Sequence, residues 1–179
     1  MAAEPKTIDY GILAAALDFY QKRGYSYKEV PWVVSDEATN VTLPKDRIAT
    51  RVPYGCLVGS AEQAFIELLK RGQQLKKHCA ITPCFRDEPD YDELHHAYFM
   101  KCELFDAQAT PQRLQAMIDD AVAFFTTYIP VKVVSTAIGY DIEAGGIELG
   151  SYGFRTYKKT TFIYGTGCAL PRLTTAMQQ

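Results

Sequence analysis

The sequence predicts one α+β domain over residues 1–179, built on an antiparallel β-sheet with helices packed on one side. Strand-like runs outnumber helical runs, and several of them follow one another across short polar or glycine-containing breaks, as in hairpins. The chain is 47% hydrophobic and 22% charged, which are ordinary values for a globular fold. Its length of 179 residues also favours one domain.

The N-terminal part reads as a helix, a strand and a loop. Apolar residues recur at helical spacing over residues 7–24, and Gly24 is a plausible stop because glycine readily adopts the conformation found after helices. Aromatic and β-branched residues over 25–34 predict a strand. Pro31 within it indicates an edge or a bulge, because proline cannot donate to a neighbouring strand. Residues 36–53 read as a polar loop.

A helix followed by a hairpin is expected next. The helix covers residues 60–75, with Ser60 as its N-cap and Gln63 three residues later, at the spacing of a capping box. Residues 79–85 and 97–105 are rich in apolar, strand-forming residues on either side of a polar loop. We therefore expect two antiparallel strands joined by a long loop.

The C-terminal part contains the clearest helical pattern, residues 110–129. Thr110 is suited to cap this helix and Pro111 to fill its first position, where the missing N–H costs nothing. Glycines then separate three strand-like runs, at residues 131–144, 146–155 and 160–167. Residues 168–179 could begin a further helix.

Charge and hydropathy exclude several classes of protein. The net charge is −2 and the isoelectric point about 5.9, so any contact with nucleic acid must be local. The densest basic stretch, residues 70–78, reads as a solvated helix end. No apolar run is long enough to span a membrane, and the N-terminus does not resemble a signal peptide. Five cysteines without a Cys-x-x-Cys pair favour free thiols in a reducing compartment, so we expect a cytoplasmic protein with no membrane partner.

Four residues flank the polar loop of the expected hairpin. Arg86 leaves the first strand and Glu88 follows it, whereas Phe99 and Glu103 lie four apart on the return strand and therefore share a face. A guanidinium at a strand end offers a fork of donors suited to phosphate, and a phenylalanine can stack on a base. The alternative is an ordinary surface hairpin with ion pairs.

The neighbouring histidines in the loop, His95 and His96, raise the question of a metal site. Adjacent residues of an extended segment point in opposite directions, so this pair would chelate zinc poorly. We interpret both as loop residues.

The flanking strands and three further segments resemble motifs of the class II aminoacyl-tRNA synthetases. The hairpin "FRDE…HHAYFMKCE" resembles motif 2, with Arg-x-Glu before the loop and Phe then Glu after it. In chain order, "RGYSYKEVPWVV" resembles motif 1, "LVGSAEQ" the Thr-x-Glu loop of seryl-tRNA synthetases, and "YGTGCALPRLTTAMQ" motif 3. "IELGS" resembles the segment that holds metal and phosphates. The resemblance covers about residues 24–178 and is nearest to seryl-tRNA synthetases.

The resemblance implies a site for ATP, Mg²⁺ and an amino acid. Two arginines would be catalytic, Arg86 at the α-phosphate and Arg172 at the γ-phosphate. The full set implied to bind ATP is Arg86, Glu88, Phe99, Glu148, Ser151 and Arg172, of which Glu148 and Ser151 would also hold magnesium. The set implied to bind the amino acid is Ser60, Glu62, Glu103, Phe162 and Tyr164, with Glu62 and Glu103 recognising its ammonium group. Ser60 could equally be no more than an N-cap.

The sequence departs from the seryl pattern just before motif 3. Seryl-tRNA synthetases typically carry a threonine and an asparagine there, whereas this chain has Phe162 and Tyr164. A site that hydrogen-bonds a serine hydroxyl needs polar partners. We therefore expect a substrate other than serine or a remodelled pocket.

The final acceptor and the assembly are also matters of expectation. We find neither an anticodon-binding domain nor a coiled-coil arm, so the acceptor could be a tRNA or a tRNA-independent one such as a carrier protein. Seryl-like ligases for carrier proteins use a zinc-binding Cys/Glu/Cys set; Cys56 and Glu103 could supply two ligands, whereas Cys168 lies awkwardly for the third. The motif 1 resemblance implies a homodimer through residues 7–35. A non-catalytic paralogue that senses a nucleotide or amino acid, or serves as a subunit, is the alternative function.

Overall fold

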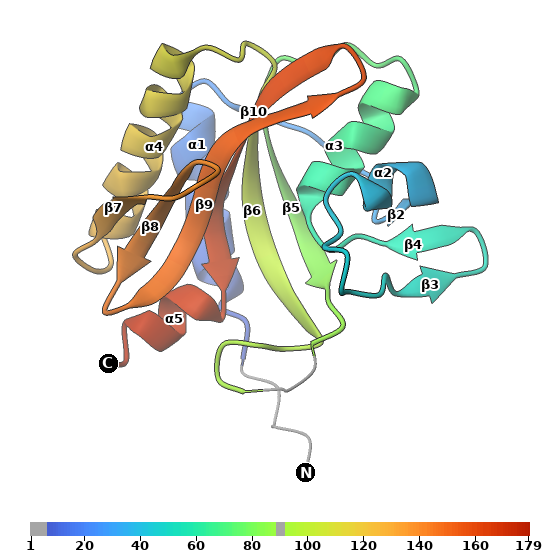
Figure 1. The fold of residues 1–179 in the computed structure, drawn as a ribbon. Coiled ribbons are helices and arrows are strands. Elements are labelled where there is room, and N and C mark those ends of the chain that lie inside the picture. The colour runs from blue at the N-terminus through green and yellow to red at the C-terminus, as the bar shows by residue number, and fades with distance from the viewer. Residues whose placement is uncertain (1–6, 89–91) are drawn as a thin grey trace.

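A computed structural model describes residues 7–88 and 92–179 and is built around a seven-stranded sheet (Figure 1). The strands run in the order β1 (Ser26–Tyr27), β5 (Lys77–Phe85), β6 (Tyr98–Asp106), β10 (Thr160–Leu170), β9 (Ile147–Tyr157), β8 (Tyr140–Ala144) and β7 (Lys132–Ser135). Neighbouring strands are antiparallel except at one edge, where β1 is parallel to β5. The predicted α+β class is confirmed, with a sheet that is mixed rather than wholly antiparallel.

Two helices cover one face of this sheet, α1 (Tyr10–Lys22) and α4 (Pro111–Thr126) (Figure 1). The expected start of α4 is confirmed: the Thr110 hydroxyl accepts a 3.2 Å hydrogen bond from the Arg113 N–H, and Pro111 opens the helix. Among the helices in the described part of the chain, none is both long and apolar enough to cross a membrane.

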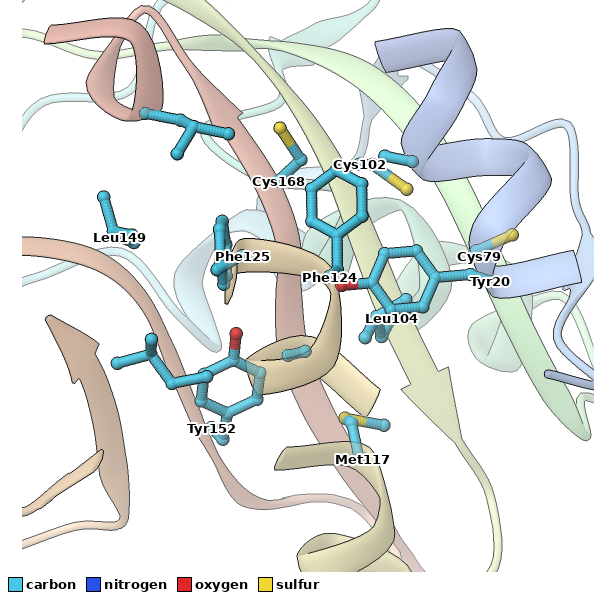
Figure 2. Packing of buried hydrophobic residues seen from close by; sticks show 14 of the residues in the cluster. Tyr20, Cys79, Cys102, Leu104, Met117, Phe124, Phe125, Leu149, Tyr152 and Cys168 are labelled. Atoms are coloured by element: carbon cyan, nitrogen blue, oxygen red, sulfur yellow. The ribbon is translucent and has the colours of Figure 1, made fainter. Parts of the chain in front are cut away.

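The space between these helices and the sheet is filled by aromatic and aliphatic side chains (Figure 2). Tyr20 of α1 and Phe124 of α4 pack together with ring centres 5.7 Å apart. Cys102 and Leu104 of β6 alternate with residues that face the other way, as strand geometry requires. All five cysteines are buried free thiols, as the sequence suggested.

The opposite face of the sheet is also covered in part, by α3 (Ala61–Lys70). Phe105 of β6 packs between Phe65 of α3 and Phe162 of β10, with ring centres 4.8 and 4.9 Å apart. The expectation that helices pack on one side is therefore wrong. On this second face Ala80, Phe105 and Phe162 of β5, β6 and β10 are apolar, and they need a covering element as the first face does.

A second, three-stranded sheet lies beside α3, in the order β2 (Val33–Val34), β4 (Gly55–Leu57) and β3 (Arg51–Val52). The strand predicted over residues 25–34 is thus two short strands, because the chain leaves the large sheet after β1 and enters the small one at β2. The predicted loop contains β3 and a short helix, α2 (Asp36–Asn40), which the Ser35 hydroxyl caps at the Ala38 N–H.

Three other boundaries differ from prediction. The run predicted over residues 131–144 is a hairpin of β7 and β8, closed by a 2.9 Å hydrogen bond from the Thr136 N–H to the Gly139 carbonyl. Helix α3 ends at Lys70 instead of residue 75, because Gly72 turns the chain with a positive φ of 76°. The C-terminal segment forms α5 (Arg172–Ala176).

Candidate active site

A cavity of about 320 Å³ lies on the sheet face that α3 only partly covers. Its wall combines the start of α3, the segment between α2 and β3, and strands β6, β9 and β10. Most of the residues predicted to bind ATP or an amino acid line it, namely Ser60, Glu62, Arg86, Glu88, Glu103, Ser151 and Tyr164. Residues that lie far apart in the chain, such as Ser60 and Tyr164, therefore line the same cavity.

The sheet register explains why these side chains share a face. Glu103 of β6 is paired with Thr166 of β10, and Tyr164, two residues earlier, projects from the same side. Lys101, two residues before Glu103, also lines the cavity. The pairing shifts between Thr166 and Cys168, so that Thr166 faces the cavity while Cys168 faces the core below α1 and α4.

A bulge in β9 brings two further predicted residues to one face. Glu148 is paired with Glu143 and Gly150 with Ile142, so one extra residue lies between them in β9. Without it, residues three apart would point to opposite faces; with it, Glu148 and Ser151 lie on one face. Asp141, the partner of Ser151, faces the same way, and burial together with the charge of Glu148 raises the pKa of its carboxyl.

This donor set fits a hard cation. Two carboxylates and a hydroxyl are oxygen ligands, which magnesium prefers. Ser151 lines the cavity, whereas Glu148 lies outside its lining and pairs with Arg172, with Nη1 3.3 Å from Oε1. Arg172 also donates to the Glu148 carbonyl at 3.2 Å. The structure thus brings Glu148 and Arg172 together beside the cavity and not within it.

Arg86 and Glu88 extend from the end of β5 toward the cavity. The Arg86 guanidinium lies over the ring of Phe99, 4.9 Å from its centre, and Phe99 itself does not line the cavity. Glu88 is bound by Arg47, with Nη1 3.0 Å from Oε2, and Arg47 also donates to the Asp87 carbonyl at 2.8 Å. Sequence reasoning missed Arg47, because it lies in an irregular segment without periodicity.

The acids predicted to bind an ammonium group are already paired. Arg155 Nε lies 2.6 Å from Glu62 Oε1, and Lys101 Nζ lies 2.9 Å from Glu103 Oε1. The other Glu103 oxygen accepts the Ala61 N–H at the start of α3, where the helix dipole favours a negative charge. Burial raises the pKa of the Glu62 carboxyl, and the charge of Arg155 opposes that rise.

Sequence reasoning missed Arg155 as a site residue. A strand whose residues alternate between faces places it with Ser151, four residues earlier, and that spacing is a signal the sequence did contain. Its partner Glu62 lies 93 residues away on another element, and only the fold shows that pairing.

Phe162 does not line the cavity, in contrast to its predicted role at the amino acid. Its side chain is fully buried beneath α3 and stacked on Phe105. Tyr164, two residues later, is half-buried and lies beneath Arg155, whose guanidinium carbon is 5.0 Å from the ring centre. The difference arises because Phe162 lies inside the apolar cluster that includes α3, whereas Tyr164 lies at the edge of that cluster and lines the cavity.

Ser60 occupies the N-cap position of α3, as predicted, but its side chain makes no capping hydrogen bond. Gln63 accepts the Gly59 N–H at 2.7 Å instead of closing a capping box on Ser60, and its amide donates to the Thr42 hydroxyl at 2.9 Å. Ser60 thus lines the cavity with a side chain that no cap engages.

The two sets of residues considered for zinc, the His95–His96 pair and Cys56 with Glu103 and Cys168, do not form a metal site in the described part of the chain. His95 contacts Asp92 at 2.9 Å, and Cys56 of the small sheet donates to Asp36 of α2 at 3.2 Å. Cys168 lies in the core on the far side of the large sheet from Glu103. Within residues 7–88 and 92–179, no group of three His, Cys, Asp or Glu side chains is placed to hold a metal ion.

Comparisons with known proteins show similarity in structure only. No protein-family model matches the sequence, and no curated protein matches it. Seryl-tRNA synthetase from Pyrococcus horikoshii, crystallised with ATP, superposes on 94% of this chain with a TM-score of 0.79 and 19% identity. A pyrrolysyl-tRNA synthetase from Desulfitobacterium hafniense superposes on 94% of this chain with a TM-score of 0.74 and 16% identity. Cytoplasmic serine-tRNA ligase from Naegleria fowleri, crystallised with AMP, also superposes on 94% of this chain, with a TM-score of 0.73 and 17% identity.

The chain therefore has the fold of a class II aminoacyl-tRNA synthetase catalytic core, as the motifs implied. It spans 49% of the Pyrococcus chain, 68% of the Desulfitobacterium chain and 47% of the Naegleria chain. The seryl-tRNA synthetase with the TM-score of 0.79 is thus about twice as long as the part matched here.

Proposed function

We propose that this protein uses ATP to activate an amino acid, forming an aminoacyl-adenylate and pyrophosphate. The observation that carries the proposal is the single cavity lined both by Arg86, Glu88 and Ser151 and by Glu62 and Tyr164. The first group has the chemistry to bind a nucleotide, and the second the chemistry to bind an amino acid. The similar folds crystallised with ATP and AMP support the nucleotide half of the proposal.

In this reaction an oxygen of the amino acid's α-carboxylate attacks the α-phosphorus of ATP. The bond from that phosphorus to the bridging oxygen breaks, and pyrophosphate leaves with the electron pair. Negative charge accumulates on the α-phosphate oxygens, and Arg86 is the cation that we assign to them. No proton transfer is needed, so positioning and electrostatics supply the catalysis.

We assign the pyrophosphate end of ATP to Arg172, Glu148 and Ser151. When bound at Glu148 and Ser151, magnesium would neutralise charge on the phosphate oxygens. Arg172 and Glu148 pair with each other at 3.3 Å. In the proposed complex they would separate, with Glu148 facing the metal and Arg172 facing the γ-phosphate.

Phe99 and Glu88 are our candidates for the adenine. Glu88 would accept a hydrogen bond from the adenine amino group, held in place by Arg47. Stacking on Phe99 requires Arg86 to leave the ring it covers, and the α-phosphate would draw the guanidinium away.

For the amino acid we assign Glu62 to the ammonium group, with Ser60 and Tyr164 as neighbouring walls. Glu103 has both carboxylate oxygens engaged by Lys101 and Ala61. We therefore propose that Glu103 fixes the start of α3, and with it the position of Glu62, instead of binding the ammonium group directly.

The acceptor of the activated amino acid and the assembly state follow from the same proposal. The acceptor would be a tRNA or a tRNA-independent acceptor such as a carrier protein. We also propose a homodimer through residues 7–35, where Tyr27, Trp32 and Val33 are exposed apolar side chains. Sedimentation of the full chain at micromolar concentration would test the dimer.

A second candidate is a non-catalytic protein that binds a nucleotide or amino acid as a sensor or subunit. One feature favours it: the ion pairs Glu148–Arg172 and Glu62–Arg155 join residues that substrates would otherwise need. Such a protein would bind ATP or an amino acid without exchanging pyrophosphate.

A pyrophosphate-exchange assay across the twenty standard amino acids tests the main proposal, with magnesium–ATP titrated in parallel by calorimetry. We expect exchange with one amino acid or a small group, and serine as the sole substrate would contradict the expected departure from seryl specificity. ATP binding without exchange for any amino acid would favour the sensor. No ATP binding in the presence of magnesium would remove the proposed activation.

A further inference from the structure

Arg155 presents unused hydrogen-bond donors to the cavity. Its Nε contacts Glu62 at 2.6 Å, while its two terminal nitrogens have no hydrogen-bond partner among the residues described. In the described chain, every fully buried side-chain nitrogen or oxygen has a hydrogen-bond partner. The terminal nitrogens of Arg155 have none, so they must be solvent-accessible. A guanidinium has the planar fork of donors that matches a carboxylate in two-point contact.

Glu62 is open in the same way. Arg155 uses its Oε1, and among the described residues no hydrogen bond engages Oε2. Since every fully buried polar side-chain atom of the described chain has a partner, Oε2 must be solvent-accessible, and Glu62 lines the cavity. The cavity therefore contains an anion and a cation in direct contact, each with a free hydrogen-bonding position.

This pair lies away from the part of the cavity assigned to phosphates. Ser151 and Arg155 are four residues apart on β9, which separates them by roughly 13 Å along the strand. Arg155 is held above Tyr164 and against the start of α3, on the side that we assign to the amino acid. A second anion bound by Arg155 would thus belong to the amino acid and not to ATP.

We infer that the amino acid taken by this cavity carries a second carboxylate on a short side chain, as aspartate and glutamate do. The inference rests on the proposed function. The ammonium group would meet Glu62 Oε2 and the side-chain carboxylate the free fork of Arg155, while the α-carboxylate faces the α-phosphate. Neutral amino acids would lack the anionic group for the free fork of Arg155 and would lose that contact, so they would bind more weakly.

Calorimetric titration tests this inference directly. L-aspartate, L-glutamate, L-asparagine, L-glutamine and L-serine are titrated into the wild-type chain, Arg155→Gln and Arg71→Gln. Arg71 is the matched control, an exposed arginine at the C-cap of α3 that also pairs with a glutamate, Glu67. We expect an acidic amino acid to bind wild type and Arg71→Gln at least tenfold more tightly than its amide, and Arg155→Gln to lose that preference.

A second variant covers the case in which Arg155→Gln fails to fold, since it leaves Glu62 buried without its cation. The double variant Glu62→Gln/Arg155→Gln removes both charges and keeps a hydrogen-bonding pair. It should melt as wild type does and show at least a tenfold loss of affinity for the acidic amino acid. Unchanged affinity in this double variant would overturn the inference.

Three results separate this inference from the proposed activation. Exchange supported only by a neutral amino acid would overturn the inference and leave activation standing. Binding of aspartate or glutamate without exchange would leave the inference standing and overturn activation. If Arg155→Gln weakened ATP and spared the amino acid, Arg155 would be a phosphate ligand and the inference would be wrong.

Discussion

The guanidinium carbon of Arg86 lies 4.9 Å from the centre of the Phe99 ring. The contact follows from the sheet register, because Cys84 of β5 is paired with Phe99 of β6 and Arg86 lies two residues beyond Cys84. Arg86 and the Phe99 ring therefore lie on one face, where a bound nucleotide could draw the guanidinium away from the ring and stack there in its place. Cation–π attraction of this kind is weak at an exposed site, so the displacement is cheap.

The first prediction concerns Arg86→Ala. Arg86 is exposed at a strand end, so the fold should persist, and the melting temperature should stay within about 2 °C of wild type. Loss of the α-phosphate cation should lower pyrophosphate exchange by about 100-fold or more, the usual effect of removing one transition-state donor. Arg51→Ala, which removes another exposed arginine, is the control. Full activity in Arg86→Ala would show that the motif 2 assignment is wrong.

The second prediction concerns Arg47, which the sequence did not single out. Arg47→Ala should free the Glu88 carboxylate to swing away from the adenine position. Charge-assisted hydrogen bonds contribute about 1.5–3 kcal/mol, so the KM for ATP should rise roughly tenfold. The KM for the amino acid should not change. An unchanged KM for ATP would separate Glu88 from adenine recognition.

The third prediction concerns the buried hydroxyl of Tyr20, which donates 2.9 Å to the Gly167 carbonyl at the irregularity in β10. Tyr20→Phe should lower the free energy of unfolding by about 1–2 kcal/mol, because a buried carbonyl loses its donor. Tyr54→Phe is the matched control, since Tyr54 is 94% exposed. Urea denaturation of both variants measures the difference, and equal midpoints would show that another group satisfies the carbonyl.

The fourth prediction concerns pH. The Tyr157 hydroxyl and the Lys158 ammonium hold the pKa of Glu37 down at about 2, against an ordinary value of 4.5. Because the folded pKa is the lower one, these contacts stabilise the protein above pH 4.5 and are lost as the pH falls toward 2. Glu37→Gln should therefore lose less stability than wild type between pH 4.5 and pH 2, as followed by circular dichroism.

Asp46→Asn is the control for the Glu37 experiment, since Asp46 is an exposed carboxylate in the segment between α2 and β3. Its stability should follow the wild-type pH profile. If the stability of Glu37→Gln fell with pH as steeply as that of wild type, other carboxylates would be responsible for the acid sensitivity.

The regular elements could be predicted because local rules determine them. The start of α4 at Thr110 and Pro111 and the β5–β6 hairpin followed from caps and periodicity. The small sheet could not be predicted, since β2 and β3 have two residues each and both need β4 as a partner. Strands that short have no period, and only pairing across the chain defines them.

The site divides in the same way. Alternation on β6 predicted that Phe99 and Glu103 share a face, and register bears this out. It could not reveal that Phe162 is covered by Phe105 and α3, or that Glu62 is bound by Arg155. Both facts depend on how a helix sits on a sheet, which motif spacing does not encode.

The most direct test of amino acid activation is the formation of the adenylate itself. The wild-type chain is mixed in excess with ATP labelled at the α-phosphorus, magnesium and each amino acid, and the bound products are separated after a single turnover. We predict label in an aminoacyl-adenylate for one amino acid or a small group, and none for Arg86→Ala. Labelled ATP that binds and stays intact with every amino acid would contradict activation.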